Sequence, residues 1–455
     1  MSCATVQKLE FSPSGNEGSF LQTPFWGLFK SRHGWKLIRA RASFGAEENR
    51  SKAKEGAAKE NALKAQEAGG FDFSILVRSF ARGFFSLAYV PLFPSEKAFK
   101  FLQAQEGGKA NDSASANEGG VANDSDGSNE GGLSDDSAGS NEGGETNSSA
   151  GSNEGGKAND AAAPSPKVFC AALDQLAAAL KALLPANTIC VRFDPQVEFP
   201  EPDERDEFNQ SVKAAAKKGR FLCKKNAVDI QPPDTTQVDL TRTEEEILAG
   251  MKNKWRYNVN LAKRKGVQIQ KISGNSLNLS DFVDIFYDLY KETSARDGIA
   301  MHAKAYYKDL LELSAQEAQK GSDVPQVNLY VASHEGDKLG AIMTLFSKTE
   351  SVYLYGCSSN KKRNLMPNFL LQWTAMSDAK AYGSCYYDMY GMPPTDDPSH
   401  PMHGLYLFKT GFGGRNVHRA GSYDVPLKGI YKLCVLAEGA RAFWHKKILK
   451  KIRGR

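Results

Sequence analysis

The chain has 455 residues, with 58 Lys and Arg residues against 53 Asp and Glu residues, a formal charge of +5. Hydrophobic residues make up 41% and aromatic residues 10%, which excludes a wholly disordered or fibrous protein. The sequence has no uncharged apolar run of about 18 residues, so we expect no membrane-spanning helix.

The N-terminus lacks a basic region followed by an apolar run, so we expect no secretory signal. The seven cysteines form no Cys-x-x-Cys pair, so neither a disulfide framework nor a zinc site is predicted. These features are typical of a cytosolic protein with reduced thiols. The length predicts two or three domains.

The first half of the chain carries short β-branched or aromatic runs bounded by turn residues, as strands do. Its predicted strands are Leu37–Ala42, Ile75–Val77, Ser86–Val90 and Thr188–Phe193. Arg78 and Arg82 interrupt the most apolar stretch, which therefore predicts two buried strands joined by a short turn. A helix is predicted over Pro166–Leu184, because its leucines at 173, 176, 180 and 183 form one apolar stripe.

Two polar insertions interrupt this half. Residues 43–70 are rich in Ala, Lys and Glu and fit a surface helix. Residues 104–163 contain Asn-Glu-Gly-Gly four times with a period of 12. These repeats have no apolar face on which to stack, so we expect a disordered insertion. It holds two lysines and 12 acidic residues, and the rest of the chain carries a formal charge of +15, which favours an anionic partner.

The second half alternates strands and helices. Its predicted strands are Thr236–Asp239, Asn328–Ser333, Gly340–Ser347, Ser351–Gly356 and Cys385–Asp388. Its predicted helices are Thr243–Gly266, Ser280–Arg296, Ala303–Glu317, Met366–Tyr382 and Ile430–Ile452. Thr243 followed by Glu246 forms a capping box at the start of the first of these helices. The pattern indicates an α/β (or α+β) fold with two strand–helix clusters that divide near residue 235.

Four longer segments carry more information than composition does. They are LQTPFWGLFKSRHGW (21–35), KNKWRYNVNLAKRKGV (252–267), the segment 355–394 that begins YGCSSNKKRNLMPNF, and HGLYLFKTGFGG (403–414). In this order and spacing they resemble the Fem family, the FemABX peptidoglycan interpeptide-bridge aminoacyltransferases. The resemblance covers nearly the whole chain apart from the two insertions.

The resemblance implies two tandem GNAT acetyltransferase-like domains, at 1–235 with the two insertions and at 236–420. Residues 421–455 are then a basic C-terminal helix that packs back on the first domain. The family carries in some members a long helical arm, but no long heptad pattern occurs between Val267 and Tyr330. The chain therefore resembles the armless members.

The resemblance also implies a reaction. An amino acid moves from aminoacyl-tRNA, the co-substrate, to the side-chain amine of the diamino acid in a peptidoglycan stem peptide. No cofactor is expected. The acceptor is a precursor on the cytoplasmic side, either lipid II or UDP-MurNAc-pentapeptide. The sequence does not distinguish between these two acceptors, or between glycine, alanine and serine as the transferred amino acid.

Three residues are expected at the acceptor. By resemblance, Arg256 contacts its pyrophosphate, as an arginine on a rigid helix can do with two hydrogen bonds, and Lys30 is the second acceptor-binding cation. Tyr306 is the expected acceptor-contacting tyrosine, although Tyr307 fits as well. The alternatives are a solvated basic face around Arg256, a lysine emerging from a buried helix at 30, and core tyrosines.

By resemblance, Lys409 is the expected catalytic residue, and the alternative is a cation on a surface loop. It stands between Phe408 and glycines that let a substrate approach closely, so we expect a loop lysine that stabilises the oxyanion formed on the aminoacyl ester. Phe408 is expected to bind substrate. Asp388 is a candidate general base, since the attacking amine must lose a proton, or else a strand-end residue that caps Gly391. The tRNA 3′ hydroxyl is a further candidate for the proton relay.

Other sites and functions fit parts of the same sequence. His400 and His403 have the spacing of a metal pair, but no carboxylate or cysteine supports one, so no metal is predicted. The tail RAFWHKKILKKIRGR (441–455) fits either an anionic inner-membrane surface or packing on the body. An acyl-CoA N-acyltransferase is the alternative enzyme, but Arg363–Asn368 lacks the glycines of a CoA pyrophosphate loop, and Pro367 has no amide donor. A scaffold that displays the acidic repeat is the non-enzymatic alternative.

Overall fold

The computed structural model describes residues 2–12, 18–46, 70–94, 96, 99–100 and 163–443. Three predictions fall mainly outside these residues: disorder of the acidic repeat at 104–163, the polar insertion at 43–70, and the basic tail at 441–455. The described residues belong to one unit, and residues 104–162 form a separate one.

The first sheet has seven strands in the order β1-β2-β3-β4-β5-β15-β7. They are β1 (Ser2–Lys8), β2 (Lys36–Ala46), β3 (Phe71–Phe80), β4 (Phe85–Phe93), β5 (Thr188–Pro195), β15 (Tyr423–Pro426) and β7 (Lys224–Lys225). Neighbouring strands are antiparallel except β4 and β5, which are parallel. The predicted pair of buried strands on either side of Arg82 is confirmed as β3 and β4.

The second sheet has eight strands in the order β6-β14-β8-β13-β12-β11-β10-β9. They are β6 (Glu198–Phe199), β14 (Arg415–Arg419), β8 (Asp234–Asp239), β13 (Tyr386–Asp388), β12 (Glu350–Ser358), β11 (Asp337–Phe346), β10 (Gln326–His334) and β9 (Gln268–Ser273). Only β12 and β13 are parallel.

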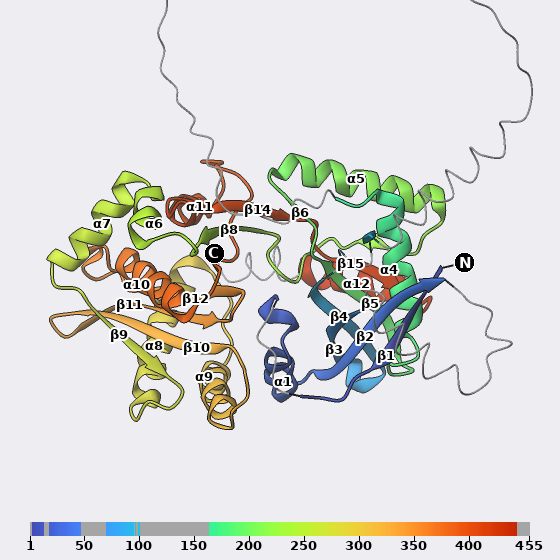
Figure 1. The fold of residues 1–455 in the computed structure, drawn as a ribbon, viewed down its shortest axis with the longest axis horizontal. Helices are drawn as coiled ribbons and strands as arrows, with labels where there is room; N and C mark the ends of the chain where they lie inside the picture. Colours follow the sequence, from blue (N-terminus) through green and yellow to red (C-terminus); the bar gives the residue numbers. More distant parts are fainter. Residues whose placement is uncertain are drawn as a thin grey trace, which may run out of the picture. The chain divides into compact units, whose positions relative to one another are not determined.

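The two sheets repeat one topology. In each, four antiparallel strands are followed by a fifth that pairs in parallel, β1 to β5 in the first sheet and β9 to β13 in the second. Helix α1 (Pro24–Arg32) lies between the first two strands of one repeat, and α8 (Leu279–Asp297) with α9 (Lys304–Gln319) between those of the other. The parallel pairs are joined through α4 (Pro166–Leu180) and α10 (Pro367–Tyr382). This repetition confirms the predicted mixed α/β fold of two similar halves (Figure 1).

Two cores hold the first sheet. On one face, the predicted leucine stripe of α4 is buried against β3, β4 and β5, with Leu173 and Leu180 fully inaccessible. Helix α5 (Pro202–Gly219), which the sequence did not predict, packs against α4. On the other face α1 contributes Phe25 and Phe29 to a core shared with α8, α9 and the second sheet. Helix α1 therefore joins the two repeats.

Each repeat also lends a strand to the other. Strand β6 lies between β5 and α5 in the chain but pairs with β14 in the second sheet. Strand β15 follows the second repeat but pairs with β5 and β7 in the first sheet. The predicted C-terminal segment 421–455 therefore begins with a strand, and its helix is α12 (Tyr431–Phe443). Tyr431 packs against Ile189 and Cys190 of β5.

The helix predicted over Thr243–Gly266 is two helices, α6 (Glu244–Gly250) and α7 (Asn253–Arg264). The predicted capping box of Thr243 and Glu246 is present at the start of α6. Met251 and Lys252 are extended, and the Lys252 amide donates to the carbonyl of Gly411 instead of to its own helix. A contact with a distant glycine therefore separates α6 from α7, and the local periodicity of the sequence cannot reveal such a contact.

None of the helices within the described ranges is long and apolar enough to cross a bilayer.

Candidate active site

Lys409 lies in the last turn of α11 (His403–Thr410) and not, as predicted, in a glycine loop. The loop prediction is wrong because the glycines at 411, 413 and 414 come after the helix and end it. Only 5% of the Lys409 surface is exposed. Its Nζ donates to the carbonyl oxygens of Met389 at 2.7 Å, Tyr390 at 3.0 Å and Gly391 at 2.8 Å. These acceptors match the three protons of an ammonium group.

Burial is the main influence on the charge of Lys409. It lowers the pKa to about 7, and the nearby Asp388 carboxylate opposes the shift. A perturbed lysine in a polar interior is typical of active sites, although structural networks produce the same effect. The catalytic role of Lys409 remains a prediction.

Asp388 ends β13 and is buried. Its Oδ1 accepts hydrogen bonds from Thr235 Oγ1 at 2.5 Å and from the Tyr390 amide at 2.7 Å. Its Oδ2 accepts from Gln237 Nε2 and Arg419 Nη2, both at 3.3 Å. The residue that Asp388 caps is thus Tyr390 rather than Gly391. Asp388 and Lys409 together hold residues 389–391 in place. Asp388 accepts from the amide of Tyr390, and Lys409 donates to the carbonyls of all three residues.

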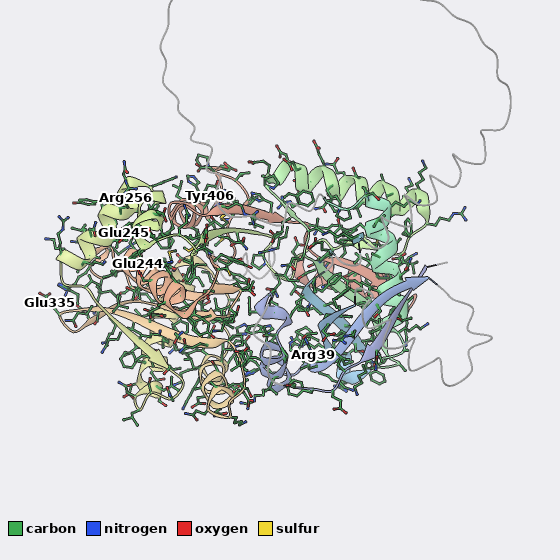
Figure 2. All side chains as sticks on the ribbon, in the orientation of Figure 1. Arg39, Glu244, Glu245, Arg256, Glu335 and Tyr406 are labelled. Atoms are coloured by element: carbon green, nitrogen blue, oxygen red, sulfur yellow. The ribbon has the colours of Figure 1, made fainter. Side chains whose placement is uncertain are left out.

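Three of the four sequence motifs meet beside Lys409. The Nε1 of Trp255 on α7 donates to the carbonyl of Phe408 at 2.9 Å. The Phe408 ring packs edge-on against Phe369 and Phe412, with centroids 5.3 Å apart in both pairs. A Cβ on Gly411 would lie 2.2 Å from the Trp255 ring, so only glycine allows this approach. In Figure 2 Arg256 and Tyr406, from α7 and α11, lie in the same part of the molecule.

Arg256 is half-buried, and its guanidinium is already engaged. Its Nη1 donates to the carbonyls at the end of α6, at 2.8 Å from Ala249 O and 2.5 Å from Met251 O, and Nη2 donates to Asn253 Oδ1. A cation here satisfies the free carbonyls of a helix C-terminus. All of these partners lie within residues 248–253, and a contact between Arg256 and the acceptor pyrophosphate stays a prediction.

Lys30 and Tyr306 do meet, although 276 positions separate them. Lys30 Nζ, from α1, lies 3.5 Å from the Tyr306 hydroxyl of α9 and 5.6 Å from the centroid of its ring. The ring of His302 stacks on that of Tyr306 at 4.0 Å. Burial, and then the charge of Arg78, lower the pKa of Lys30 to about 8. Tyr307 is fully buried, and its hydroxyl accepts from the His302 amide, so Tyr306 is the tyrosine that faces Lys30.

A buried carboxyl that the sequence did not indicate lies beside Asp388. Glu350, at the start of β12, is 4% exposed and accepts from the Phe20 amide at 2.6 Å and from the Tyr386 hydroxyl at 2.9 Å. It ties the segment before α1 to the second sheet. Burial first, and repulsion by Asp388 second, raise the pKa of Glu350 to about 7. No spacing in the sequence distinguishes this glutamate from a surface one.

Glu350 predicts a pH dependence of stability. Its ordinary pKa is 4.5, so the folded state holds the proton more tightly than the unfolded state. The stabilisation that follows is fully present below pH 4.5 and is lost as the pH rises to about 7. We expect the difference in free energy of unfolding between wild type and Glu350→Gln to fall by about 3 kcal/mol across this window. Urea denaturation at a series of pH values measures it.

The matched control is Glu207→Gln, an exposed glutamate on α5. Its effect should stay within about 0.5 kcal/mol at every pH. A difference for Glu350→Gln that is equally flat would contradict the burial argument.

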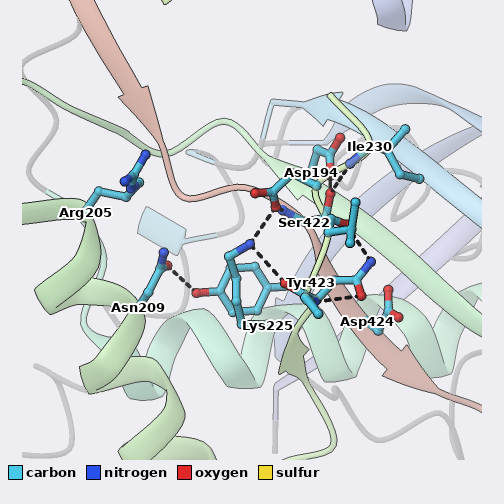
Figure 3. A network of polar contacts seen from close by, with 12 residues as sticks. Asp194, Arg205, Asn209, Lys225, Ile230, Ser422, Tyr423 and Asp424 are labelled. Carbon is cyan, nitrogen blue, oxygen red and sulfur yellow. Dashed lines mark hydrogen bonds and ion pairs between the residues drawn. The ribbon is translucent and has the colours of Figure 1, made fainter. Parts of the chain in front are cut away.

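A second polar network holds β15 in the first sheet (Figure 3). Asp194 accepts from the Ser422 hydroxyl at 2.5 Å and from Tyr89, and burial raises the pKa of Asp194 to about 6. The Tyr423 hydroxyl donates to Asn209 Oδ1 at 2.6 Å, and Lys225 pairs with Asp229. These groups satisfy one another, so we interpret the network as structural.

His400 and His403, which have the spacing of a metal pair, each bind a different nearby group. His403 Nε2 lies 2.5 Å from Asp396 Oδ1, and His400 Nδ1 accepts from the Met402 amide. Within the described part of the chain, no group of three or more His, Cys, Asp or Glu residues is arranged to hold a metal ion.

Comparisons with known proteins agree on one family. The sequence model of the FemAB family matches residues 167–320 and 312–438. "Lipid II:glycine glycyltransferase" of Staphylococcus aureus strain COL is 24% identical over 302 residues, which cover 54% of this chain and 71% of the relative. The protein of the same name from strain MSSA476 is 24% identical over 53% of this chain and 70% of its own length.

A solved structure shares the fold. The crystal structure of FemX matches with a TM-score of 0.56 and 16% identity, over 94% of this chain and all of FemX. This likeness extends to both sheets, as the predicted resemblance requires. With the sequence match covering more than half of its residues, the chain belongs to the FemAB family.

Proposed function

We propose that the chain is an aminoacyltransferase that builds peptidoglycan interpeptide bridges. It moves glycine, alanine or serine from aminoacyl-tRNA to the side-chain amine of the stem-peptide diamino acid in a lipid-linked or UDP-linked precursor. The observation that carries the proposal is the match to the FemAB family, together with relatives whose names describe transfer of glycine to lipid II. The meeting of Lys30 with Tyr306 supports an acceptor site at the joint of the two repeats.

In this proposal Lys30 and Tyr306 bind the acceptor. Lys30 is half-buried, with aromatic rings and no carboxylate as its partners among the described residues, so its charge is available to a phosphate. Arg256 is the second proposed pyrophosphate contact. Its hydrogen bonds to the end of α6 favour a different role, in which Arg256 fixes the junction of α6 and α7. The geometry therefore supports Lys30 and Tyr306 more strongly than Arg256.

The proposed chemistry lies around Lys409. The acceptor amine has a reference pKa of about 10.4 and must lose a proton before it attacks the ester carbonyl. Negative charge then develops on that carbonyl oxygen, and a buried ammonium group stabilises it strongly in a water-poor site. Lys409 can supply this charge by exchanging one of its three carbonyl partners for the substrate oxygen. Phe408 contacts the substrate beside it, and Asp388 positions the 389–391 segment.

Asp388 is less suited to act as the general base than the sequence indicated. Both of its oxygens accept two hydrogen bonds within the protein, one of them from Arg419. A base needs a lone pair directed at the amine. The tRNA 3′ hydroxyl, which leaves the ester in the reaction, is the alternative proton carrier.

Acyl-CoA dependence is the alternative function, and the backbone at 363–369 does not favour it. A CoA loop offers free amides to the phosphates. Here the amides of Leu365, Met366 and Phe369 donate to the carbonyls of residues 362, 363 and 366, and Pro367 has no amide proton.

We also propose that the chain works on the cytoplasmic side, in peripheral contact with the membrane that carries a lipid-linked acceptor. On α12, Leu433 and Leu436 are 65% and 69% exposed, and the helix leads into the basic tail. Exposed leucines beside lysines and arginines fit an anionic membrane surface.

Labelled donors test the reaction. We expect label from one aminoacyl-tRNA to appear in the muropeptide when the full chain is added, and we expect ribonuclease treatment of the donor to abolish transfer. Acylation of the acceptor by labelled acetyl-CoA, with none from any aminoacyl-tRNA, would favour the alternative and overturn the proposal.

A further inference from the structure

Two cations meet at one aromatic ring on the first repeat. Lys30 Nζ lies 5.9 Å from the centroid of the Trp35 ring, and Arg78 Cζ, from β3, lies 5.4 Å from the same centroid. The two charges are close enough that Arg78 contributes to the lowered pKa of Lys30. Neither cation forms an ion pair with a carboxylate in the described residues. Like charges held together without an acid between them favour an anionic ligand.

The groups around Lys30 and Arg78 include a hydrogen-bond donor for an anion, and the nearby carboxylate is already paired with other cations. The Tyr306 hydroxyl lies 3.5 Å from Lys30 Nζ. The nearby Asp309 carboxylate is already paired with Arg32 at 2.8 Å and with His33 at 2.9 Å. A pyrophosphate, with a charge on each phosphate, matches a lysine and an arginine that can each contact one phosphate.

Arg78 also marks the end of the sheet face that α1 covers. Side chains alternate along β3, so Ile75 and Val77 enter the α4 core, whereas Leu76, Arg78 and Phe80 share the other face. Helix α1 covers this face further along, where Gly27 packs on Leu37. Beyond α1, the side chains of Arg78 and Phe80 on this face are exposed.

Exposed aromatic rings follow Arg78 directly. Phe80 is 37% exposed and Phe84, in the connection to β4, is 74% exposed. Ala81 and Arg82 adopt left-handed φ angles of 50° and 56°, which non-glycine residues seldom do, and this turn presents Phe84 to solvent. Two phenyl rings are therefore accessible to solvent beside the exposed side chains of Arg78 and Arg82.

We propose that Arg78 and Lys30 together bind the pyrophosphate of a polyprenyl-pyrophosphate-linked acceptor, and that Phe80 and Phe84 contact the first isoprene units of its carrier. The inference rests on the proposed function and assigns a lipid-linked acceptor over a UDP-linked one. Beyond its pyrophosphate a lipid-linked acceptor continues as hydrocarbon, which gains from covering phenyl rings. A UDP-linked acceptor continues as uridine, whose hydroxyl and imide groups need polar partners.

Arg78→Gln tests the cation pair. We expect KM for both short-chain lipid-linked and UDP-linked muropeptide to rise about tenfold, with kcat within a factor of about two, because a hydrogen bond to a charged group is lost. Wild-type acceptor affinity should fall above about pH 8, where Lys30 loses its proton. In Arg78→Gln this fall should move to higher pH, because the repulsion on Lys30 is gone.

Phe84→Ser tests the choice of acceptor. KM for the lipid-linked muropeptide should rise several-fold and KM for the UDP-linked one should stay unchanged. The controls are Lys213→Gln, which removes an exposed charge from α5, and Leu222→Ser, which removes a leucine that is 55% exposed elsewhere. Neither control should change either KM.

Two results would overturn the inference: an unchanged KM and pH profile in Arg78→Gln, or equal effects of Phe84→Ser on both acceptors. Calorimetric titration of wild type and Arg78→Gln with inorganic pyrophosphate separates this inference from the proposed function, because it needs no turnover. If no transfer occurs but wild type binds pyrophosphate more tightly than the variant, the proposed function fails and the anion site stands. If both proteins bind pyrophosphate equally, Arg78 is not part of an anion site and the inference is wrong.

Discussion

Replacing Lys409 with Met should lower kcat for aminoacyl transfer by at least about 10²-fold, the loss expected when one preorganised donor to a developing oxyanion is removed. Met fills similar space but supplies no charge and no proton. It also leaves the carbonyls of 389–391 without their shared partner. Single-turnover rates at saturating acceptor measure the chemical step directly.

Lys380→Met is the matched control. Lys380 also lies in the last turn of its helix, α10, and its Nζ donates to a backbone carbonyl, that of Leu240 at 3.0 Å. We expect it to lose some stability and to keep kcat within a factor of about three. Wild-type kcat in a folded Lys409→Met protein would contradict the proposed role of Lys409.

Gly413→Ala should lower the free energy of unfolding by about 3 kcal/mol or more. Gly413 has φ +80°, and a Cβ there would lie 2.2 Å from the carbonyl oxygen of Gly250. The left-handed backbone costs about 1–2 kcal/mol for alanine, and the clash with a rigid backbone adds a comparable amount. Because this contact holds α11 against the end of α6, activity should fall with it. Urea denaturation and kcat of the same preparation measure both effects.

Gly404→Ala, in the first turn of α11, is the control. Nothing lies within 4 Å of a Cβ built there. Alanine should leave stability unchanged or raise it by up to about 1 kcal/mol. Equal effects of the two substitutions would show that the junction of α6 and α11 does not depend on Gly413.

Local patterns in the sequence were sufficient to predict most of the helices and strands. The leucine stripe of α4, the capping box at Thr243 and the β-branched runs predicted the helices and strands close to their observed bounds. The pairing of β6 and β15 with the opposite sheets was not predictable, since both strands are short and their partners lie far away in the chain. Tertiary contacts, not propensity, make them strands.

The candidate site likewise has residues that the sequence predicted and contacts that it did not. The family resemblance indicated Lys30 and Tyr306 separately, and the fold brings them together through the core shared by α1 and α9. The sequence could not show that Arg256 would be engaged by the end of α6, or that Lys409 would lie in a helix. Both depend on carbonyl groups, which every residue carries and which no sequence pattern distinguishes. Glu350 was missed because the Phe20 amide that it binds lies 330 positions away in the chain.

The most direct measurement is the mass and linkage of the product. The full chain is incubated with a lipid-linked muropeptide and, in separate reactions, with glycyl-, alanyl- and seryl-tRNA, and the stem peptide is sequenced by tandem mass spectrometry. We expect one of these donors to add a single amino acid, in amide linkage, to the side-chain amine of the diamino acid. A stem peptide that keeps its original mass with all three donors, while a known transferase modifies it under the same conditions, would disprove the proposed function.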